Sequence, residues 1–258
     1  MHETFAAPAH WRAIDFISDL HLAENTPRVF EAWAAHLRHT CADAVFILGD
    51  LFDVWIGDDM AERGFEARCV EVLSEAAKAR TIAFMPGNRD FLVGDAMLEA
   101  SGVMRLADPT LVIAFGQRVL VSHGDALCLD DVAYQRYRAV VRRPGLQRAF
   151  AALPFAVRRS IGSAMRSRGA RQRTPARSVS VDVDADAALR WTHEADAATL
   201  VHGHTHAPAS HALGPGVVRH VLSDWDIDDE GVPPRAEILR WQASGFARIA
   251  PETGTSAA

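Results

Sequence analysis

Five short apolar segments, each followed at once by a polar motif, constrain the fold of this chain more than any other feature. The segments lie at residues 13–17, 44–48, 81–85, 119–121 and 199–201. Such runs, bounded by glycine or polar residues, are typical of buried strands, and open α/β sheets gather binding residues at the carboxyl ends of their strands. We therefore expect five motifs to converge: Ser18-Asp19-Leu20-His21, Gly49-Asp50, Gly87-Asn88-Arg89-Asp90, His123-Gly124-Asp125 and His202-Gly203-His204-Thr205-His206.

The segments between these runs predict a single catalytic domain over residues 1–258, because a half-apolar chain of this length can bury one substantial core. Apolar residues three and four positions apart in 26–39 and 65–79 predict helices between strands, hence βαβ units and a largely parallel sheet. A hairpin is expected at 112–121. Further elements are expected downstream: an acidic helix at 182–193, strands at 217–222 and 236–239, and a disordered tail at 251–258.

The segment 132–181 contains twelve arginines and no Asp, Glu or Lys. The other 15 basic residues face 33 acidic ones, so the rest of the chain carries a charge of −18. We expect the segment to form two or three helices, broken at Pro144-Gly145, Pro154 and Gly162, inserted into the domain as a cap. Aromatic and aliphatic side chains interleave with the arginines, which suits a ligand with a phosphate and an apolar part, or an anionic membrane surface; a solvated helical face is the alternative.

The cysteines and the hydropathy indicate the compartment. Cys41, Cys69 and Cys128 have no paired spacing, and residues 1–11 lack the pattern of a secretory leader. We therefore expect reduced thiols in a cytoplasmic protein, and no apolar run is long enough for a membrane span.

The polar motifs offer the ligands of two divalent cations. Asp19 and His21 are two residues apart, so in an extended stretch their side chains point the same way. Asp50 is placed to bridge two metals, which would bring the cations to the ~3.5 to 4 Å separation of two-metal hydrolytic sites. The seven candidate ligands are Asp19, His21, Asp50, Asn88, His123, His204 and His206. Mixed nitrogen and oxygen ligands favour Mn, Fe, Co or Zn over Mg or Ca, and the ligands alone do not choose among these four. We expect two ions and take Mn²⁺ as the first choice.

In this order, the five motifs resemble those of the calcineurin-like metallophosphoesterases. Within that superfamily, the chain is similar to the family of UDP-2,3-diacylglucosamine diphosphatases of lipid A biosynthesis. The similarity extends over most of the chain from about Ile14 and rests on four stretches: Ile47-Leu48-Gly49-Asp50-Leu51-Phe52, Trp55-Ile56-Gly57-Asp58-Asp59, Gly87-Asn88-Arg89-Asp90-Phe91-Leu92, and His123-Gly124-Asp125-Ala126-Leu127-Cys128 with Asp130-Asp131. The resemblance implies an α/β fold, a four-layer α/β/β/α sandwich with a helical cap.

The resemblance also implies roles for individual residues. One metal would be held by Asp19, His21, Asp50 and His206, and the other by Asp50, Asn88, His123 and His204. Asn88, Arg89, His123 and His204 would be catalytic. Substrate would contact Asn88, Arg89, Asp131, Arg173, Arg177 and His204. The cap departs from the family pattern, since Gly169, Arg173 and Ala176 stand where Ser, Asn and Lys are expected.

Arg89 carries independent chemical information. Many phosphomonoesterases of the superfamily have a histidine at this position, which can protonate an alkoxide leaving group. An arginine is always charged and cannot act as that acid, although it can stabilise charge on a phosphoryl group. The site therefore suits a substrate whose leaving group is already good, such as the phosphate released from a diphosphate.

Together these inferences predict hydrolysis of UDP-2,3-diacylglucosamine to UMP and 2,3-diacylglucosamine 1-phosphate, with attack at the uridylyl-side phosphorus. They also predict peripheral association with the cytoplasmic side of the inner membrane, and no nucleic-acid partner. The oligomeric state is left open. Two alternatives remain at this stage. One is a nucleotide diphosphatase or phosphodiesterase with the same metals and no lipid substrate, and the other is a non-catalytic module that binds RNA or another anionic ligand.

Overall fold

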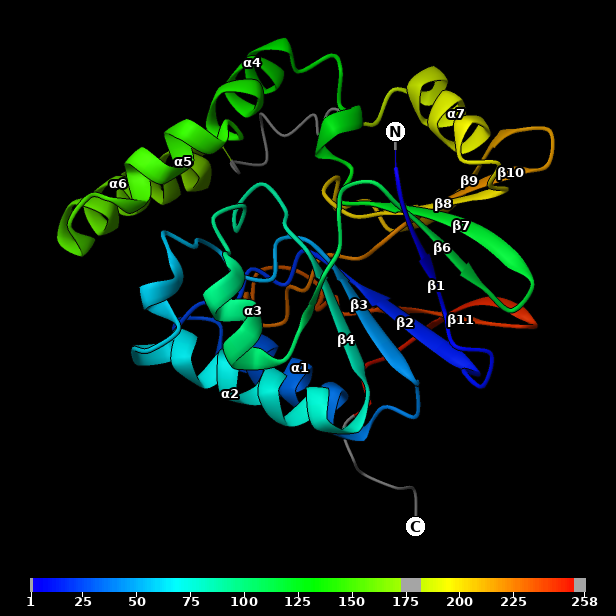
Figure 1. Cartoon of the computed structure of the whole chain (residues 1–258), viewed down its shortest axis with the longest axis horizontal. Helices are drawn as coiled ribbons and strands as arrows, with labels where there is room; N and C mark the ends of the chain where they lie inside the picture. The colour runs from blue at the N-terminus through cyan, green and yellow to red at the C-terminus, as the bar shows by residue number, and fades with distance from the viewer. Residues whose placement is uncertain (1, 173–181, 253–258) are drawn as a thin grey trace.

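Two six-stranded sheets pack face to face in the computed structural model, which describes residues 2–172 and 182–252 (Figure 1). The first sheet has the order β12 (Gly245–Ile249), β11 (Ile238–Gln242), β2 (Ala13–Ile17), β3 (Ala44–Leu48), β4 (Thr81–Met85) and β5 (Met104–Arg105). The second has the order β1 (Glu3–Ala6), β6 (Thr110–Ala114), β7 (Gln117–Ser122), β8 (Thr199–His202), β10 (Val217–Val221) and β9 (Ala209–Gly214). Both sheets are mixed, and β2 to β5 form the parallel core expected from the sequence.

Helices cover the outer faces of both sheets. The first sheet carries α1 (Pro27–His39), α2 (Gly64–Ala79) and α3 (Asp95–Ser101), and the second carries α7 (Ala185–Glu194). Strand residues alternate between the layers: Ile17 and Ile47 pack toward the helices, whereas Phe16 and Phe46 pack between the sheets. The strands β2 and β3 are fully buried because both of their faces are covered, and they are apolar apart from Asp15, which forms an ion pair with Arg240. The expected four-layer α/β/β/α sandwich is therefore confirmed.

The arginine-rich segment forms three helices, α4 (Val132–Val141), α5 (Pro144–Ala151) and α6 (Phe155–Gln172), which lie on the side of the sheets away from α1 and α2 (Figure 1). The chain turns near Pro144 and Pro154 as expected, but the break predicted at Gly162 is wrong, because α6 continues through it. A Cβ atom on Gly162 would lie 2.8 Å from Ile56 Cγ2, so the glycine permits close packing of the helix rather than ending it. The remainder of the segment expected as a cap, residues 173–181, and most of the expected tail lie outside the described residues.

Several short elements carry too little periodicity to be predicted from the sequence. These are β1, β5, β9, β12, α3 and the 3₁₀ turns Asp58–Met60 and Asp125–Leu127. Most of these strands lie at the edges of their sheets, where one backbone face is unpaired and the apolar pattern is weak. In the described part of the chain, no helix is both long enough and apolar enough to cross a bilayer.

Candidate metal centre

The loops that follow β2, β3, β4, β7 and β8 bring the seven predicted ligands together at one end of the sandwich. Asp19, Asp50 and His123 are buried, whereas His21, Asn88, His204 and His206 remain partly accessible. Each loop begins at the carboxyl end of its strand, and the parallel pairs β2·β3, β3·β4 and β7·β8 place those ends side by side. The shared edge that the strand pattern predicts is therefore present, and it is formed by both sheets.

Several of the predicted ligands have a strained backbone with a positive φ angle. Among the described residues, seven other than glycine have positive φ, and five of them are predicted ligands: Asp19, His21, Asp50, His204 and His206, with φ between 49° and 68°. This left-handed conformation is uncommon for such residues and persists only where the surrounding structure imposes it. Such strain clusters at functional sites, so the backbone indicates the same residues independently of their chemistry.

Asp19, His21 and His206 form the first group of candidate ligands. His206 Nε2 lies 3.3 Å from both Asp19 Oδ1 and His21 Nε2. The other oxygen of Asp19 accepts hydrogen bonds from Ser18 Oγ at 2.6 Å and from the backbone N–H of His204 at 2.8 Å. These bonds hold the carboxylate so that Oδ1 faces the imidazoles.

Asn88, His123 and His204 meet in a second group beside Asp50. His123 Nε2 and His204 Nδ1 each lie 2.9 Å from Asn88 Oδ1. His123 donates its Nδ1–H to the carbonyl of Leu48 at 2.9 Å, which fixes the tautomer and leaves Nε2 for a metal. Burial and the neighbouring His123 lower the pKa of His204 to about 3, so its ring stays neutral and can act as a ligand.

Asp50 lies between the two groups. Its Oδ2 is 3.9 Å from His21 Nδ1, and its Oδ1 is 3.7 Å from His123 Nε2. Asp19 also belongs to a cluster with Asp50 and His123, so both carboxylates approach both groups. Burial, with the nearby Asp90 and Asp19, raises the pKa of Asp50 to about 7.

This donor set fits two divalent cations. Donor atoms about 2.1 Å from one shared cation lie roughly 3.0 to 3.4 Å apart, close to the separations found within each group. Burial favours the neutral form of His123, but Asp50 and Asp125 outweigh it and raise the pKa to about 9. Buried carboxylates beside imidazoles thus need positive charge, which divalent cations would supply.

Two aspartates outside the predicted ligand set hold the loops in place. Asp90 is buried and accepts hydrogen bonds from the backbone N–H groups of Gly87 at 2.7 Å and Leu51 at 2.8 Å, so it ties the Asn88 loop to the Asp50 loop. Asp224 Oδ2 lies 3.5 Å from His206 Nδ1, and Arg235 holds the same carboxylate. Sequence reasoning missed Asp224, although it follows β10, which is parallel to β8, so the strand-end pattern could have identified it.

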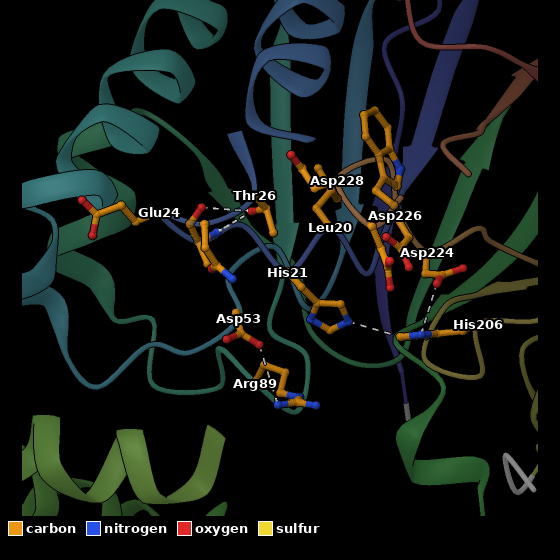
Figure 2. A pocket seen from close by; sticks show the side chains of 14 residues that line it. Leu20, His21, Glu24, Thr26, Asp53, Arg89, His206, Asp224, Asp226 and Asp228 are labelled. Carbon is orange, nitrogen blue, oxygen red and sulfur yellow. Dashed lines mark hydrogen bonds and ion pairs between the residues drawn. The ribbon is translucent and has the colours of Figure 1, made fainter. Parts of the chain in front are cut away.

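Arg89 lies at the boundary between two cavities beside the metal centre. Its Nη1 is 3.8 Å from Asp53 Oδ1 (Figure 2), and both residues line both cavities. The backbone N–H of Arg89 donates to Asp50 Oδ1 at 2.8 Å, which holds the loop carrying the guanidinium against the ligands. One cavity has a volume of about 870 Å³ and includes His21 and His206; the other, of about 640 Å³, includes Asn88 and extends under the cap.

The remaining predicted substrate-binding residues fall in different places. Asp131 lines the cavity under the cap and also caps the N-terminus of α4, where its side chain accepts from the N–H of Tyr134 at 2.9 Å. Gly169 lies within α6, whereas Arg173, Ala176 and Arg177 lie outside the described residues.

Three arginines of the cap bind the body of the protein. Arg138 Nε donates to Asp125 Oδ2 at 2.8 Å, and Arg142 Nη2 donates to the carbonyl of Gly87 at 2.8 Å, directly before Asn88. Arg158 is buried, and its two terminal nitrogens lie 2.9 and 2.6 Å from the carboxylate oxygens of Asp59. These guanidinium groups therefore hold the cap over the metal centre. The sequence pattern alone could not distinguish arginines with this structural role from arginines that bind a ligand.

Replacing Gly203 by alanine should weaken metal binding, because the new Cβ would collide with Ser18 Oγ and Asp19 Oδ2. We expect metal affinity to fall by a factor on the order of 10 to 100, the usual cost of disturbing the partners of a ligand. Metal titration of the purified variant measures this. Gly145→Ala is the matched control, since nothing lies within 4 Å of a Cβ atom at that position. Equal affinities in the two variants would contradict the assignment of Asp19 as a ligand.

Comparison with known proteins agrees with a metal-dependent phosphoesterase site. Residues 13–208 match the model of the Calcineurin-like phosphoesterase family. A UDP-2,3-diacylglucosamine hydrolase of Chromobacterium violaceum is 40% identical over 85% of this chain and 97% of that protein. Proteins of the same name from Aromatoleum aromaticum, over 89% of this chain and 93% of that protein, and Coxiella burnetii, over 81% and 88%, are 39% and 38% identical. The chain therefore belongs to the calcineurin-like phosphoesterase family and, within it, to the family of UDP-2,3-diacylglucosamine hydrolases.

Proposed function

We propose that this protein hydrolyses UDP-2,3-diacylglucosamine to UMP and 2,3-diacylglucosamine 1-phosphate. The observation that carries the proposal is the junction at Arg89, where the candidate metal centre meets an apolar cavity under the cap. A diphosphate at the metals could thus be joined to acyl chains in that cavity. The names of the curated relatives support the same substrate.

The cavity under the cap, here called the apolar groove, is formed by helices and by loops of the body together. Its apolar lining includes Val54, Ile56, Phe91, Leu146, Phe150 and Ile161. Most ligand sites enclose roughly 300 to 1,000 Å³, and the groove lies within that range at about 640 Å³. Acyl chains gain free energy there by leaving water, whereas a nucleotide diphosphate without a lipid would leave this surface uncovered.

Residues around the junction supply the groups that a diphosphate needs. Arg89 offers a forked set of donors to phosphate oxygens, and Asn88 and His204 orient the same group from the second ligand group. When bound, two divalent cations neutralise charge on the phosphate and make a water molecule nucleophilic at neutral pH. The leaving phosphate needs no proton from the protein, which is consistent with an arginine at position 89. Manganese is the metal we propose, since imidazole, amide and carboxylate ligands all suit it.

The outer surface of the cap suits an anionic membrane. Eight of the ten large apolar side chains exposed in the described residues lie between 129 and 161; Tyr137, Leu146 and Ile161 line the groove, whereas others such as Val140, Leu153 and Val157 lie outside it. Arg136, Arg148 and Arg159 are exposed on the same helices, which carry no acidic residue. Basic and apolar side chains on one helical surface favour binding at a lipid interface. We therefore propose peripheral association with the cytoplasmic side of the inner membrane, with the cap facing the lipid.

Product analysis tests the reaction. The purified protein is incubated with UDP-2,3-diacylglucosamine and Mn²⁺ in water enriched in ¹⁸O, and both products are analysed by mass spectrometry. We expect UMP that carries the ¹⁸O atom and unlabelled 2,3-diacylglucosamine 1-phosphate. Label in the lipid product would place the attack on the other phosphorus, and turnover of UDP-sugars without acyl chains at an equal rate would support the non-lipid alternative.

A charge in the groove should act selectively on the diacylated substrate. Leu146→Asp replaces a side chain that is 45% exposed in the groove, so folding should survive. Burying a leucine side chain contributes roughly 1.5 to 3 kcal/mol, so kcat/KM on the diacylated substrate should fall at least about tenfold. Hydrolysis of bis(p-nitrophenyl) phosphate should not change. Val232→Asp is the control, because Val232 is 37% exposed and lies outside the cap and outside both cavities.

A further inference from the structure

We infer that the second cavity beside Arg89 binds the uridine half of the substrate, and that Asp226 is an acceptor for its O–H or N–H donors. This inference rests on the proposed function. The apolar groove accounts for the acyl chains, and the second cavity would bind the uridine half. The cavity is called the acidic cavity below. Its carboxylates are Glu24, Asp53, Asp224, Asp226, Asp228 and Asp229.

The position of the acidic cavity follows from the residues that it shares with the reaction centre. His21 and His206 of the first ligand group line it, and Arg89 and Asp53 separate it from the apolar groove. In Figure 2 the ring of His21 lies between Arg89 and the carboxylates of Asp226 and Asp228, and His206 lies beside it. A diphosphate at the metals therefore has one cavity on each side. Since the two halves of the substrate leave the diphosphate in opposite directions, each cavity can receive one half.

The chemistry of the two linings decides which half enters which cavity. The groove under the cap is largely apolar and suits two acyl chains. Carboxylates around the acidic cavity repel phosphate, so the diphosphate stays at Arg89 and the metals, while neutral groups that donate hydrogen bonds are favoured. Uridine is such a group, with two ribose hydroxyls and one imide N–H. Acidic residues serve as ribose acceptors in dinucleotide-binding folds for the same reason.

Three of the six carboxylates in the acidic cavity already accept hydrogen bonds that stabilise the fold. Arg235 donates to Asp224 at 2.7 Å, and Asp228 caps α1 by accepting from the backbone N–H groups of Arg28 and Val29 at 3.0 and 2.9 Å. Asp229 accepts from the N–H of Gly231 at 2.8 Å. These interactions explain three of the six side chains through the fold alone.

Asp226 is different. It is half-buried, and two backbone hydrogen bonds with Arg235, each of 2.8 Å, hold its main chain, yet within the described residues no hydrogen bond reaches its carboxylate. Its carboxylate is therefore an acceptor in the lining of the cavity that receives no hydrogen bond from the described residues, although Arg235 interacts with it electrostatically. The two ribose hydroxyls and the imide N–H of uridine are donors that this carboxylate could accept.

Product inhibition tests the assignment, because the two products separate the halves of the substrate. Asp226→Ala should raise the inhibition constant of UMP about tenfold, the loss expected for a hydrogen bond to a charged acceptor. The inhibition constant of 2,3-diacylglucosamine 1-phosphate should change less than about twofold. Leu146→Asp should give the reverse pattern, and inorganic phosphate should inhibit both variants equally. Asp226→Asn, which keeps the shape of the side chain, should show the same selectivity for UMP with a smaller loss.

Calorimetric binding of UMP to the Mn²⁺-loaded protein separates this inference from the proposed reaction. If the wild-type protein does not release UMP from UDP-2,3-diacylglucosamine, the proposed function is wrong, whereas weaker binding of UMP by Asp226→Ala would still support the cavity assignment. Conversely, if turnover occurs and both Asp226 variants bind UMP as the wild type does, the assignment is wrong. A loss confined to the lipid product would also overturn it, by placing the acyl half in the acidic cavity.

Discussion

Asp50→Ala is expected to abolish hydrolysis, with a loss in kcat on the order of 10³ or more. The change removes a carboxylate whose two oxygens face His21 and His123, one in each ligand group. Losing it should disturb both metal positions, and the stabilisation of phosphate charge by two cations is worth several kcal/mol, with each 1.36 kcal/mol equal to a factor of ten in rate. Metal content by mass spectrometry and steady-state kinetics on UDP-2,3-diacylglucosamine measure the two effects.

The folded state of this variant should survive, which makes the loss of activity interpretable. Burial raises the pKa of Asp50 to about 7, so the metal-free protein favours a neutral group at this position. When folding raises the pKa of a carboxyl group, the free energy of unfolding of the protein decreases as the pH rises from about 4 toward 7. Replacing Asp50 by alanine removes this decrease. Thermal unfolding of the metal-free protein at pH 7 should therefore show no large destabilisation. Asp186→Ala, at an exposed position on α7, is the control, and substantial Mn²⁺-dependent activity in folded Asp50→Ala would exclude the two-metal assignment.

Arg89→Lys is expected to lower kcat by a factor on the order of 10² even though the positive charge is kept. The guanidinium is a planar fork that can donate to two phosphate oxygens at once, and the ammonium group of lysine cannot reproduce that geometry. The backbone hydrogen bond from residue 89 to Asp50 does not depend on the side chain, so metal content should stay the same. Kinetics and metal analysis of the same preparation test both statements.

The control for this change is Arg12→Lys, an equivalent substitution at an exposed position outside both cavities. It should leave kcat unchanged. A lysine variant at position 89 with near-normal kcat would show that a point charge is sufficient. In that case the planar geometry of the guanidinium would not be required at position 89. It would also not explain why arginine stands there instead of histidine.

The sequence pattern predicted the buried strands and the edge at which the candidate ligands meet, and the resemblance to a known family supplied the four layers. Buried strands such as β2 and β3 are short, largely apolar and bounded by glycine or polar residues, so their pattern is local and visible without coordinates. Because parallel strands end at one edge, the motifs after them had to meet. Gly162 shows the limit of local rules, since its role depends on Ile56, more than a hundred residues away.

Tertiary structure alone decided which side chains around the metal centre act on one another. Twelve arginines in one segment suggested a ligand-binding surface, but Arg138, Arg142 and Arg158 bind the body of the protein, and no sequence pattern separates them from the exposed ones. Asp224 and Asp226 approach the site only because β10 lies beside β8 in the second sheet. Strand ends and helix faces are encoded over a few residues, and sequence therefore predicts them. Partners across loops depend on how the sheets pack, and only the folded chain brings them together.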